Sequence, residues 1–204
     1  MKALIYDGPE AITFREVPEP IPSQDNVLIK IKAVGICGSD MHAYLGHDER
    51  RPAPLILGHE AAGIISGGKR DGERVTINPL VSCGDCLVCK ARRENICPNR
   101  QIISMPPREG AFAQYVSMPE KNLVIVPNDY PLEKAALVEP LAVGWHTAKL
   151  AVRALDVTME KRALVIGGGA IGLATALALK AMGIDDLTIS EFNPLRRENL
   201  LHHI

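Results

Sequence analysis

The stretch Arg162–Ser190 reads RALVIGGGAIGLATALALKAMGIDDLTIS and decides the fold class of this 204-residue chain. Its first part, Arg162–Ile166, is an apolar run typical of a buried strand. An Ala/Leu-rich run over Ala170–Met182 predicts a helix, and Gly183 is suited to cap its C-terminus. Leu187–Ser190 predicts a second strand. Strand, helix and strand at this spacing predict a βαβ unit with a parallel sheet, which is an α/β architecture.

The glycines between the first strand and the helix form the pattern G-x-G-x-x-G. Gly167 permits a tight turn, Gly169 lets the backbone approach a pyrophosphate, and Gly172 lets the helix pack closely on the strand. Because a strand precedes the pattern and a helix follows it, we expect a dinucleotide to bind here, with Ile171 in the same loop. The pyrophosphate would lie at the helix N-terminus, where free N–H groups favour an anion. The alternative is a tight turn that binds no ligand.

Glu191 stands at the end of the second expected strand and bears on the choice of dinucleotide. Its carboxylate can accept hydrogen bonds from the ribose hydroxyls of NAD and would repel a 2′-phosphate, so the sequence favours NAD over NADP. Arg196 and Arg197 weaken this preference, since an arginine can bind a 2′-phosphate or stack on adenine. Alternatively, both lie on the solvated face of an expected helix over Pro194–Leu201.

The overall composition is that of a globular protein. Hydrophobic residues make up 47% of the chain and charged residues 23%, with a net charge of −1, which excludes disordered, collagen-like and coiled-coil chains and disfavours a nucleic-acid partner. Met1–Pro9 has neither the apolar run nor the cleavage site of an export signal. A membrane span over Ala163–Leu179 is an alternative, but its glycines favour a strand, a turn and a helix. We expect a cytoplasmic protein with no membrane partner.

The residues before the βαβ unit predict mainly β structure, because short apolar or alternating runs are separated by turn residues. The expected strands are Ala3–Tyr6, Val27–Val34, Ala61–Ile65, Glu73–Ile77, Phe112–Ser117 and Val124–Val126. Two helices, Glu133–Leu137 and Leu141–Ala154, follow them. Many short strands with dense turns predict a barrel-like domain. We expect the boundary near residues 151–160, giving domains over 1–150 and 151–204.

Four of the five cysteines are clustered in one segment, at Cys83, Cys86, Cys89 and Cys97. Cysteines two residues apart can point their thiolates at one centre, and four sulfurs suit tetrahedral Zn²⁺ in a closed structural site. The basic residues within the segment would offset part of the negative charge of such a centre. Disulfides, an iron–sulfur cluster and unligated thiols are the alternatives.

The fifth cysteine, Cys37, is isolated in the sequence GICGSD. A lone cysteine is commonly a small buried hydrophobic residue. Gly58-His59-Glu60 and Val138-Glu139-Pro140, however, each follow other apolar runs. A thiolate, an imidazole and a carboxylate that converge from distant segments can form an open zinc site, with a position left for water or substrate.

These motifs together resemble one family. GICGSD, GHE, the four-cysteine segment, VEPLAVGWH and VIGGGAIG occur in the order found in zinc-dependent medium-chain alcohol and polyol dehydrogenases. The resemblance covers essentially the whole chain. It implies a GroES-like β-barrel catalytic domain over residues 1–150, followed by the start of a Rossmann NAD-binding domain over 151–204. It also implies two zinc ions per chain, one catalytic and one structural, and NAD as cofactor.

Matched position by position, the resemblance implies a catalytic zinc at Cys37, His59 and Glu139. Alcohol dehydrogenases carry a cysteine at the third position, and a carboxylate in the context EPLAVG looks like the sorbitol, iditol and sugar-alcohol branch. Glu60 matches a position that approaches or ligates the zinc in some states; its alternative role is that of a simple buried hydrogen-bond acceptor.

Three further residues match positions around that zinc. Asp40 matches the carboxylate that orients the zinc histidine, and Ser39 and His42 match a relay that carries the substrate proton toward solvent. Alternatively, Asp40 is a turn residue and His42 an exposed loop histidine. His47 is expected to be exposed, in a charged loop with Asp48, Glu49, Arg50 and Arg51.

The resemblance implies hydride transfer between NAD and a secondary alcohol of a polyol, sugar alcohol or sugar acid. The partners are then a small alcohol or ketone and, for the full-length form, copies of itself in a dimer or tetramer. Two departures from the family are a short loop at Ile65–Arg74 and a nucleotide domain that stops after about two strands. The chain therefore looks truncated, and a non-catalytic zinc-binding fragment is the alternative. A quinone or enone reductase of the same superfamily, which usually lacks both zinc sites, is a third.

Overall fold

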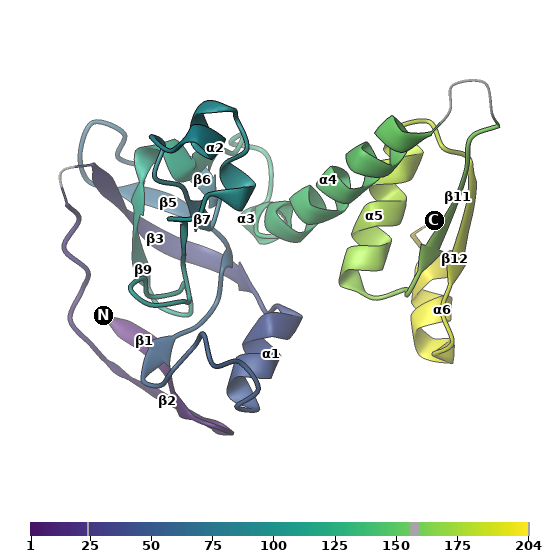
Figure 1. Ribbon diagram of the computed structural model, residues 1–204. Coiled ribbons are helices and arrows are strands. Elements are labelled where there is room, and N and C mark those ends of the chain that lie inside the picture. The colour runs from purple at the N-terminus through teal and green to yellow at the C-terminus, as the bar shows by residue number, and fades with distance from the viewer. Residues whose placement is uncertain (24, 156–159, 204) are drawn as a thin grey trace. The chain divides into compact units, whose positions relative to one another are not determined.

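The computed structural model describes residues 1–23, 25–155 and 160–203, and the chain divides into two compact units, Met1–Leu137 and Val138–Ile204 (Figure 1). The division comes earlier in the chain than the expected boundary between residues 150 and 151. The reason is that helix α4 (Val138–Ala154) packs along α5 (Ala170–Ala181) within the second unit. Residues 156–159 of the expected boundary region lie outside the described residues.

The first unit is built on two antiparallel sheets. The larger sheet has the order β10-β6-β5-β3-β9 and the smaller one the order β2-β1-β4. The strands of the larger sheet are β3 (Asn26–Gly35), β5 (Glu60–Ser66), β6 (Arg74–Ile77), β9 (Tyr115–Pro119) and β10 (Leu123–Ile125). Those of the smaller sheet are β1 (Lys2–Gly8), β2 (Ala11–Glu16) and β4 (Leu55–Ile56). A bridge between Ala3 and Ala113, and a 2.8 Å hydrogen bond from Leu4 N to Phe112 O, link β1 to the segment that leads into β9.

The core of the larger sheet is aliphatic, as alternation along the strands predicts. Ile29, Ile65, Val75 and Met118 are fully buried in one cluster that β3, β5, β6 and β9 build together. The clustered side chains are mostly β-branched, which suits a pleated, buried surface. The expected strands over 3–6, 27–34, 61–65, 73–77 and 124–126 are confirmed to within a few residues.

Two features of the β region differ from the expectation. The strand expected at Phe112–Ser117 begins only at Tyr115, because the amides of Ala111 and Phe112 donate instead to the carbonyls of Gly58 and Leu57. Strand β2 was not expected, and all its residues are exposed, so no buried alternation marks it in the sequence.

Short helices and turns complete the first unit. They are α1 (Gly38–Tyr44), α2 (Leu87–Lys90), α3 (Leu132–Ala135) and the 3₁₀ turns Glu94–Ile96 and Glu120–Asn122. The two-residue strands β7 (Leu80–Val81) and β8 (Gln101–Ile102) pair and close the base of the four-cysteine segment.

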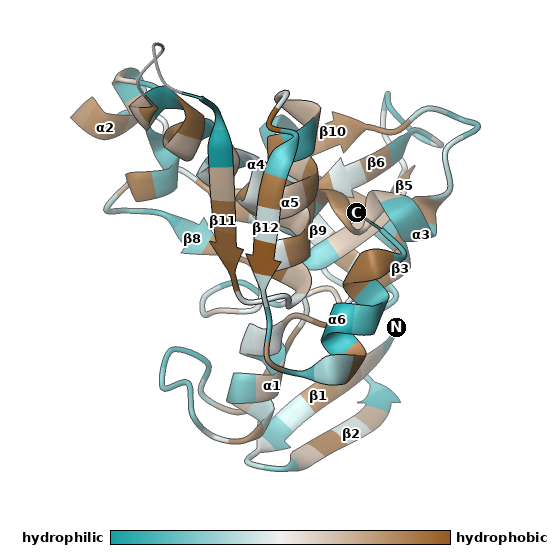
Figure 2. Ribbon diagram, turned by 90° about the vertical axis from the view of Figure 1, so that its right-hand side faces the viewer, coloured by the Kyte–Doolittle hydropathy of each residue, from teal (hydrophilic) through white to brown (hydrophobic). Residues whose placement is uncertain are grey.

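The second unit contains the expected βαβ unit. Strands β11 (Arg162–Ile166) and β12 (Asp186–Ser190) are parallel, with α5 between them in sequence and α6 (Pro194–Leu201) after them. Gly183 follows α5 with a φ of 81°, a left-handed conformation that glycine adopts without strain, which confirms its role at the helix end. After Arg162, β11 is hydrophobic, whereas β12 alternates polar with hydrophobic residues (Figure 2). No helix in the described ranges is long and apolar enough to cross a membrane.

Candidate functional site

The pairing of β3 with β5 brings Cys37 and His59 together. The two strands are antiparallel, and Gly35 at the end of β3 lies opposite Glu60 at the start of β5. The chain leaving β3 and the chain entering β5 therefore meet at one edge of the sheet. Cys37 follows Gly35 as the N-cap of α1, and His59 directly precedes β5.

Cys37, His59 and Glu60 form a group of metal-ligating side chains in this corner. One ligand atom from each, a sulfur, a ring nitrogen and a carboxylate oxygen, lies within 4.8 Å of the other two. His59 and Glu60 are buried. A Cβ at Gly35 would lie 2.2 Å from Glu60 Oε2, so a side chain here would displace this carboxylate from its position. A soft thiolate, an imidazole and a carboxylate are ligand types that zinc accepts.

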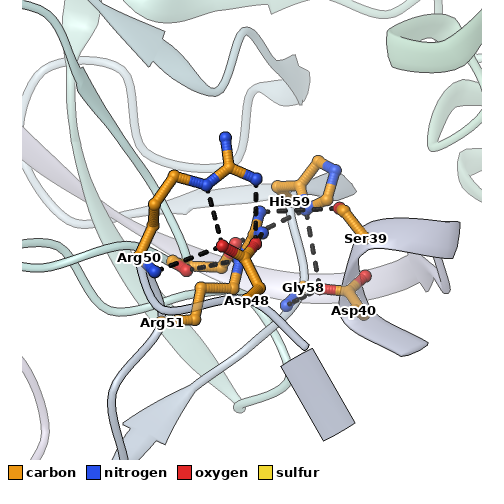
Figure 3. Close-up of polar contacts among 8 residues, drawn as sticks. Ser39, Asp40, Asp48, Arg50, Arg51, Gly58 and His59 are labelled. Atoms are coloured by element: carbon orange, nitrogen blue, oxygen red, sulfur yellow. Dashed lines mark hydrogen bonds and ion pairs between the residues drawn. The ribbon is translucent and has the colours of Figure 1, made fainter. Parts of the chain in front are cut away.

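Asp40 ties together the two segments that carry these ligands. Its Oδ2 accepts a 3.0 Å hydrogen bond from Cys37 N, and its Oδ1 accepts a 3.1 Å hydrogen bond from Gly58 N. The same Oδ1 lies 3.6 Å from His59 Nδ1 (Figure 3). Nδ1 thus faces a carboxylate, which leaves the other ring nitrogen of His59 for a metal.

The charges around His59 favour a cation. Burial works against a charge on the imidazole, yet hydrogen bonds to Asp40 and Cys37 raise the pKa of His59 to about 10. The hydrogen bond to His59 lowers the pKa of the Cys37 thiol, against the effect of burial. Burial also opposes ionisation of Asp40, but its hydrogen bond to His59 leaves the pKa of Asp40 lowered. Two groups inclined to be anionic around an imidazole would attract a divalent cation as they attract the proton.

Two residues beside this group escaped the sequence analysis. Ser104 is fully buried with a φ of 64°, and its Oγ lies 3.4 Å from His59 Nδ1. Arg51 is only 3% exposed, and its Nε donates to the carbonyl oxygen of Ser104 at 3.0 Å. No motif marks Ser104, and Arg51 stands in a charged run that resembles a solvated loop.

The two residues expected to carry a proton lie on α1. Ser39 is half-buried, and its Oγ accepts a 3.5 Å hydrogen bond from Arg51 Nη2. His42 is exposed, and its ring centre lies 6.4 Å from that of His47, which is also exposed. Within the described ranges, no hydrogen bond joins the His42 ring to Ser39, so the relay between them stays a prediction.

Glu139, the remaining expected zinc ligand, lies in the first turn of α4 in the second unit. The group formed by Cys37, His59 and Glu60 belongs wholly to the first unit. The role of Glu139 as a ligand therefore stays a prediction.

The four-cysteine segment folds into a closed cage. Its sulfurs all lie within 4.8 Å of one another, with separations of 3.9, 3.9 and 3.5 Å for Cys83–Cys89, Cys86–Cys97 and Cys97–Cys83. Four sulfurs about 2.3 Å from a central zinc ion would be about 3.8 Å apart. All are free thiols, so the structure contradicts the disulfide alternative. A multi-iron cluster would separate its cysteines further, since several atoms lie between them.

The burial of the cage is uneven. Cys89 and Cys97 are buried, whereas Cys83 is exposed. Burial raises the pKa of Cys89, while a backbone hydrogen bond involving Cys83 lowers that of Cys97. A divalent cation at the centre would favour the thiolate form of all four.

The glycine loop has the geometry that a pyrophosphate requires. Gly167 has a φ of 97°, and a Cβ at Gly172 would lie 1.9 Å from the Gly167 carbonyl oxygen, so both positions require glycine. Gly169 is the N-cap of α5, and a Cβ there would meet nothing within 4 Å. The missing side chain at Gly169 therefore leaves open space at the N-terminus of the helix, where an anion is favoured. Ile171, in the first turn of α5, is exposed beside it.

Glu191 lies against this loop. Its carboxylate accepts 2.8 Å hydrogen bonds from the amides of Gly168 and Asn193. The bond from Asn193, then that from Gly168, lowers the pKa of Glu191, so the carboxylate is charged. Arg196 Nη1 lies 3.8 Å from Glu191 Oε2.

Comparison with known proteins identifies the family. The family model "Alcohol dehydrogenase GroES-like domain" matches residues 23–128, more than half of the chain. The chain belongs to this family. The alcohol dehydrogenase GroES-like segment contains Cys37, His59, Glu60 and the four cysteines of the cage, so both metal-ligating groups of the first unit lie within it.

Relatives of this alcohol dehydrogenase GroES-like chain include sugar-alcohol enzymes. It is 38% identical over 207 residues to the sorbitol dehydrogenase of Bacillus subtilis strain 168, covering 97% of this chain and 58% of that protein. Galactitol-1-phosphate dehydrogenase from Escherichia coli superposes with a TM-score of 0.89 at 29% identity, over 100% of this chain and 59% of that one. An alcohol dehydrogenase from Escherichia coli CFT073, solved with NADH, superposes with a TM-score of 0.89 at 30% identity. The match covers 100% of this chain and 60% of that one. The chain thus spans less than two thirds of the length of these relatives.

Proposed function

We propose that this chain is part of a zinc-dependent oxidoreductase that transfers hydride between NAD and a secondary alcohol of a polyol, sugar alcohol or sugar acid. The convergence of Cys37, His59 and Glu60 at the edge of the β3–β5 pair carries the proposal. The likeness to sorbitol and galactitol-1-phosphate dehydrogenases supports the substrate class.

The catalytic zinc would be held by Cys37 and His59 with a carboxylate from Glu139 or Glu60. A zinc ion there supplies Lewis-acid stabilisation of an alkoxide at neutral pH. Asp40 holds His59 in one orientation and fixes the amide of Cys37, so both ligands are set before the metal arrives.

Ser39 would accept the proton that the substrate hydroxyl loses. It is half-buried and stands two residues after Cys37, in the first turn of α1. Ser39 would in turn release its own hydroxyl proton toward His42, which is exposed on the same helix and can exchange with water. General-base help of this kind contributes about 10²- to 10⁴-fold to a rate.

The four-cysteine cage would hold a structural zinc. Its sulfurs already lie at tetrahedral spacing, and the cage offers no fifth ligand position for a substrate. Its role is to fix the segment between β7 and β8.

The second unit would bind NAD as the start of a Rossmann domain. The open space at Gly169 accommodates the pyrophosphate, and the charged carboxylate of Glu191 suits the ribose hydroxyls better than a 2′-phosphate. Arg196, paired with Glu191, would lie at the adenosine side. NAD supplies the hydride acceptor. We further propose a cytoplasmic location, which keeps five free thiols reduced, and a dimer or tetramer for the whole protein.

A non-catalytic zinc-binding protein is the second candidate, because the two metal-ligating groups, Cys37/His59/Glu60 and the four cysteines, both lie in the first unit and could bind zinc without the nucleotide-binding unit. The full-length protein, assayed for NADH formation with a panel of polyols and sugar acids, separates the two. We expect turnover on at least one polyol that stops when a chelator removes zinc. Full zinc content without turnover on any member of the panel would contradict the enzyme proposal.

A further inference from the structure

Arg51 is a buried cation at the edge of the proposed catalytic-zinc site. The residue is 3% exposed, and its guanidinium makes three separate contacts; two of the partners, Asp48 and Ser39, are labelled in Figure 3. Nε donates to the Ser104 carbonyl, Nη1 pairs with the Asp48 carboxylate, and Nη2 donates to Ser39 Oγ at 3.5 Å. Asp48 balances the buried charge, since its own pKa is lowered to about 2 by Arg50 and Arg51.

Two of these contacts lead to the reacting groups. Ser39 is the proposed proton acceptor, and Ser104 touches His59 Nδ1 through its hydroxyl at 3.4 Å. The planar guanidinium of Arg51 therefore holds both Ser39, the proposed proton acceptor, and Ser104. The hydroxyl of Ser104 is, after Asp40, the second partner of the zinc ligand His59. The rigid fork of an arginine suits this, because it presents several donors at fixed angles.

The chemistry of arginine restricts what Ser39 can do. Arg51 has donors but no acceptor, so the Ser39 oxygen must receive a hydrogen from it. Ser39 then keeps one lone pair for the substrate hydroxyl, and its own proton must leave in a direction other than Arg51. The fixed positive charge of Arg51 beside Ser39 Oγ also stabilises the negative charge that develops on the substrate oxygen as its proton moves.

We propose that Arg51 is a positioning residue that orients Ser39 for proton transfer and, through Ser104, steadies His59. This inference rests on the proposed dehydrogenase function. It assigns a role to Arg51 of the charged loop 47–51, which acts through Ser39 and Ser104.

Arg50 provides a matched control. It is adjacent in sequence, and both of its side-chain hydrogen bonds go to Asp48. Its side chain is 69% exposed, and it has no contact with Ser39 or Ser104 among the described residues. Arg50→Gln and Arg51→Gln therefore remove the same charge from the same loop, but only the second frees Ser39.

The test uses the full-length enzyme saturated with zinc and NAD. We expect Arg51→Gln to lower kcat about 10-fold, with KM for the alcohol within twofold, because orientation of a proton acceptor contributes to the rate and not to substrate binding. The solvent deuterium isotope effect on kcat should rise, since proton transfer becomes slower. Zinc release to a chelator should be about 10-fold faster. Arg51→Lys should lie between Arg51→Gln and the unmodified enzyme, and Arg50→Gln should match the latter.

Several results would overturn the inference. One is an Arg51→Gln enzyme that behaves like Arg50→Gln. Another is a lower kcat with an unchanged isotope effect, since a merely structural defect has that signature. If Arg51→Gln does not retain zinc, Arg51→Lys decides: a raised isotope effect supports the role, and an unchanged one rejects it. An unmodified enzyme that oxidises no polyol would instead overturn the proposed function, and this inference with it.

Discussion

The two metal-ligating groups of the first unit are built in opposite ways. The cage at Cys83, Cys86, Cys89 and Cys97 comes from one short segment, and its spacing alone brings the sulfurs together. The group at Cys37, His59 and Glu60 exists only because β3 pairs with β5 in a particular register. The first site is closed and local, whereas the second is open and assembled. A local site should lose its metal only when one of its own ligands is substituted. An assembled site should also lose metal affinity when a residue that holds its segments together is substituted.

The largest expected effect is on the closed site. Cys97→Ser should release its zinc and lower the unfolding temperature by about 10 °C or more, because a structural zinc contributes its binding free energy to folding. Lys90, Arg92 and Arg93 are already exposed, and loss of the fixed backbone conformation makes the segment around them a substrate for trypsin. Limited proteolysis and thermal unfolding measure both consequences. Cys37→Ser is the matched control and should leave the segment resistant; equal cleavage in the two variants would contradict the division between sites.

The next effect concerns turnover at the open site. His59→Ala should lower kcat/KM at least about 1,000-fold, which corresponds to about 4 kcal/mol of transition-state stabilisation. The unfolding temperature should change much less than in Cys97→Ser. Steady-state kinetics with NAD and the best polyol substrate measure it. Activity within tenfold of the unmodified enzyme would show that the assembled group is not the reaction centre.

Asp40→Asn tests whether the assembled site depends on the residue that joins its segments. Asparagine removes the negative charge beside His59 Nδ1 and has a single accepting oxygen, so one of the two hydrogen bonds from Cys37 N and Gly58 N is lost. We expect zinc to bind about 10- to 100-fold more weakly at the open site, and we expect the zinc affinity of the cage to stay unchanged. Competition with a chelator gives both affinities. Equal weakening at the two sites would argue against the assembled character of the open site.

A smaller effect separates Gly169 from Gly172 in the glycine loop of the second unit. Gly172→Ala should destabilise the fold by about 1–3 kcal/mol, because its Cβ meets the Gly167 carbonyl. Gly169→Ala has free space for its Cβ, so stability should hold while NADH binding weakens, since the methyl enters the space proposed for the pyrophosphate. Thermal unfolding and NADH fluorescence titration distinguish them. Unchanged NADH affinity in Gly169→Ala would remove the loop from the cofactor site.

The same contrast explains what the sequence could predict. The βαβ unit, the role of Gly183 and the cysteine cage follow from contiguous patterns, and the structure has them where expected. The meeting of Cys37 with His59 depends on strand register, which no local pattern encodes. It became predictable only through the family resemblance.

The residues that the sequence analysis missed share one physical property. Ser104 and Arg51 are buried by tertiary packing, and neither has a neighbouring pattern that signals burial. Arg51 lies in a run of charges that looks solvated, and only its contacts with Ser104 and Ser39 show otherwise. The position of the unit boundary also follows from tertiary contacts, those between α4 and α5.

The most direct test of two distinct metal sites is the zinc content of the full-length protein and of Cys37→Ser, measured by inductively coupled plasma mass spectrometry. We predict two zinc ions per chain in the unmodified protein and one in Cys37→Ser, with the remaining ion in the four-cysteine cage. Equal zinc content in the two proteins would contradict a metal centre at Cys37, His59 and Glu60.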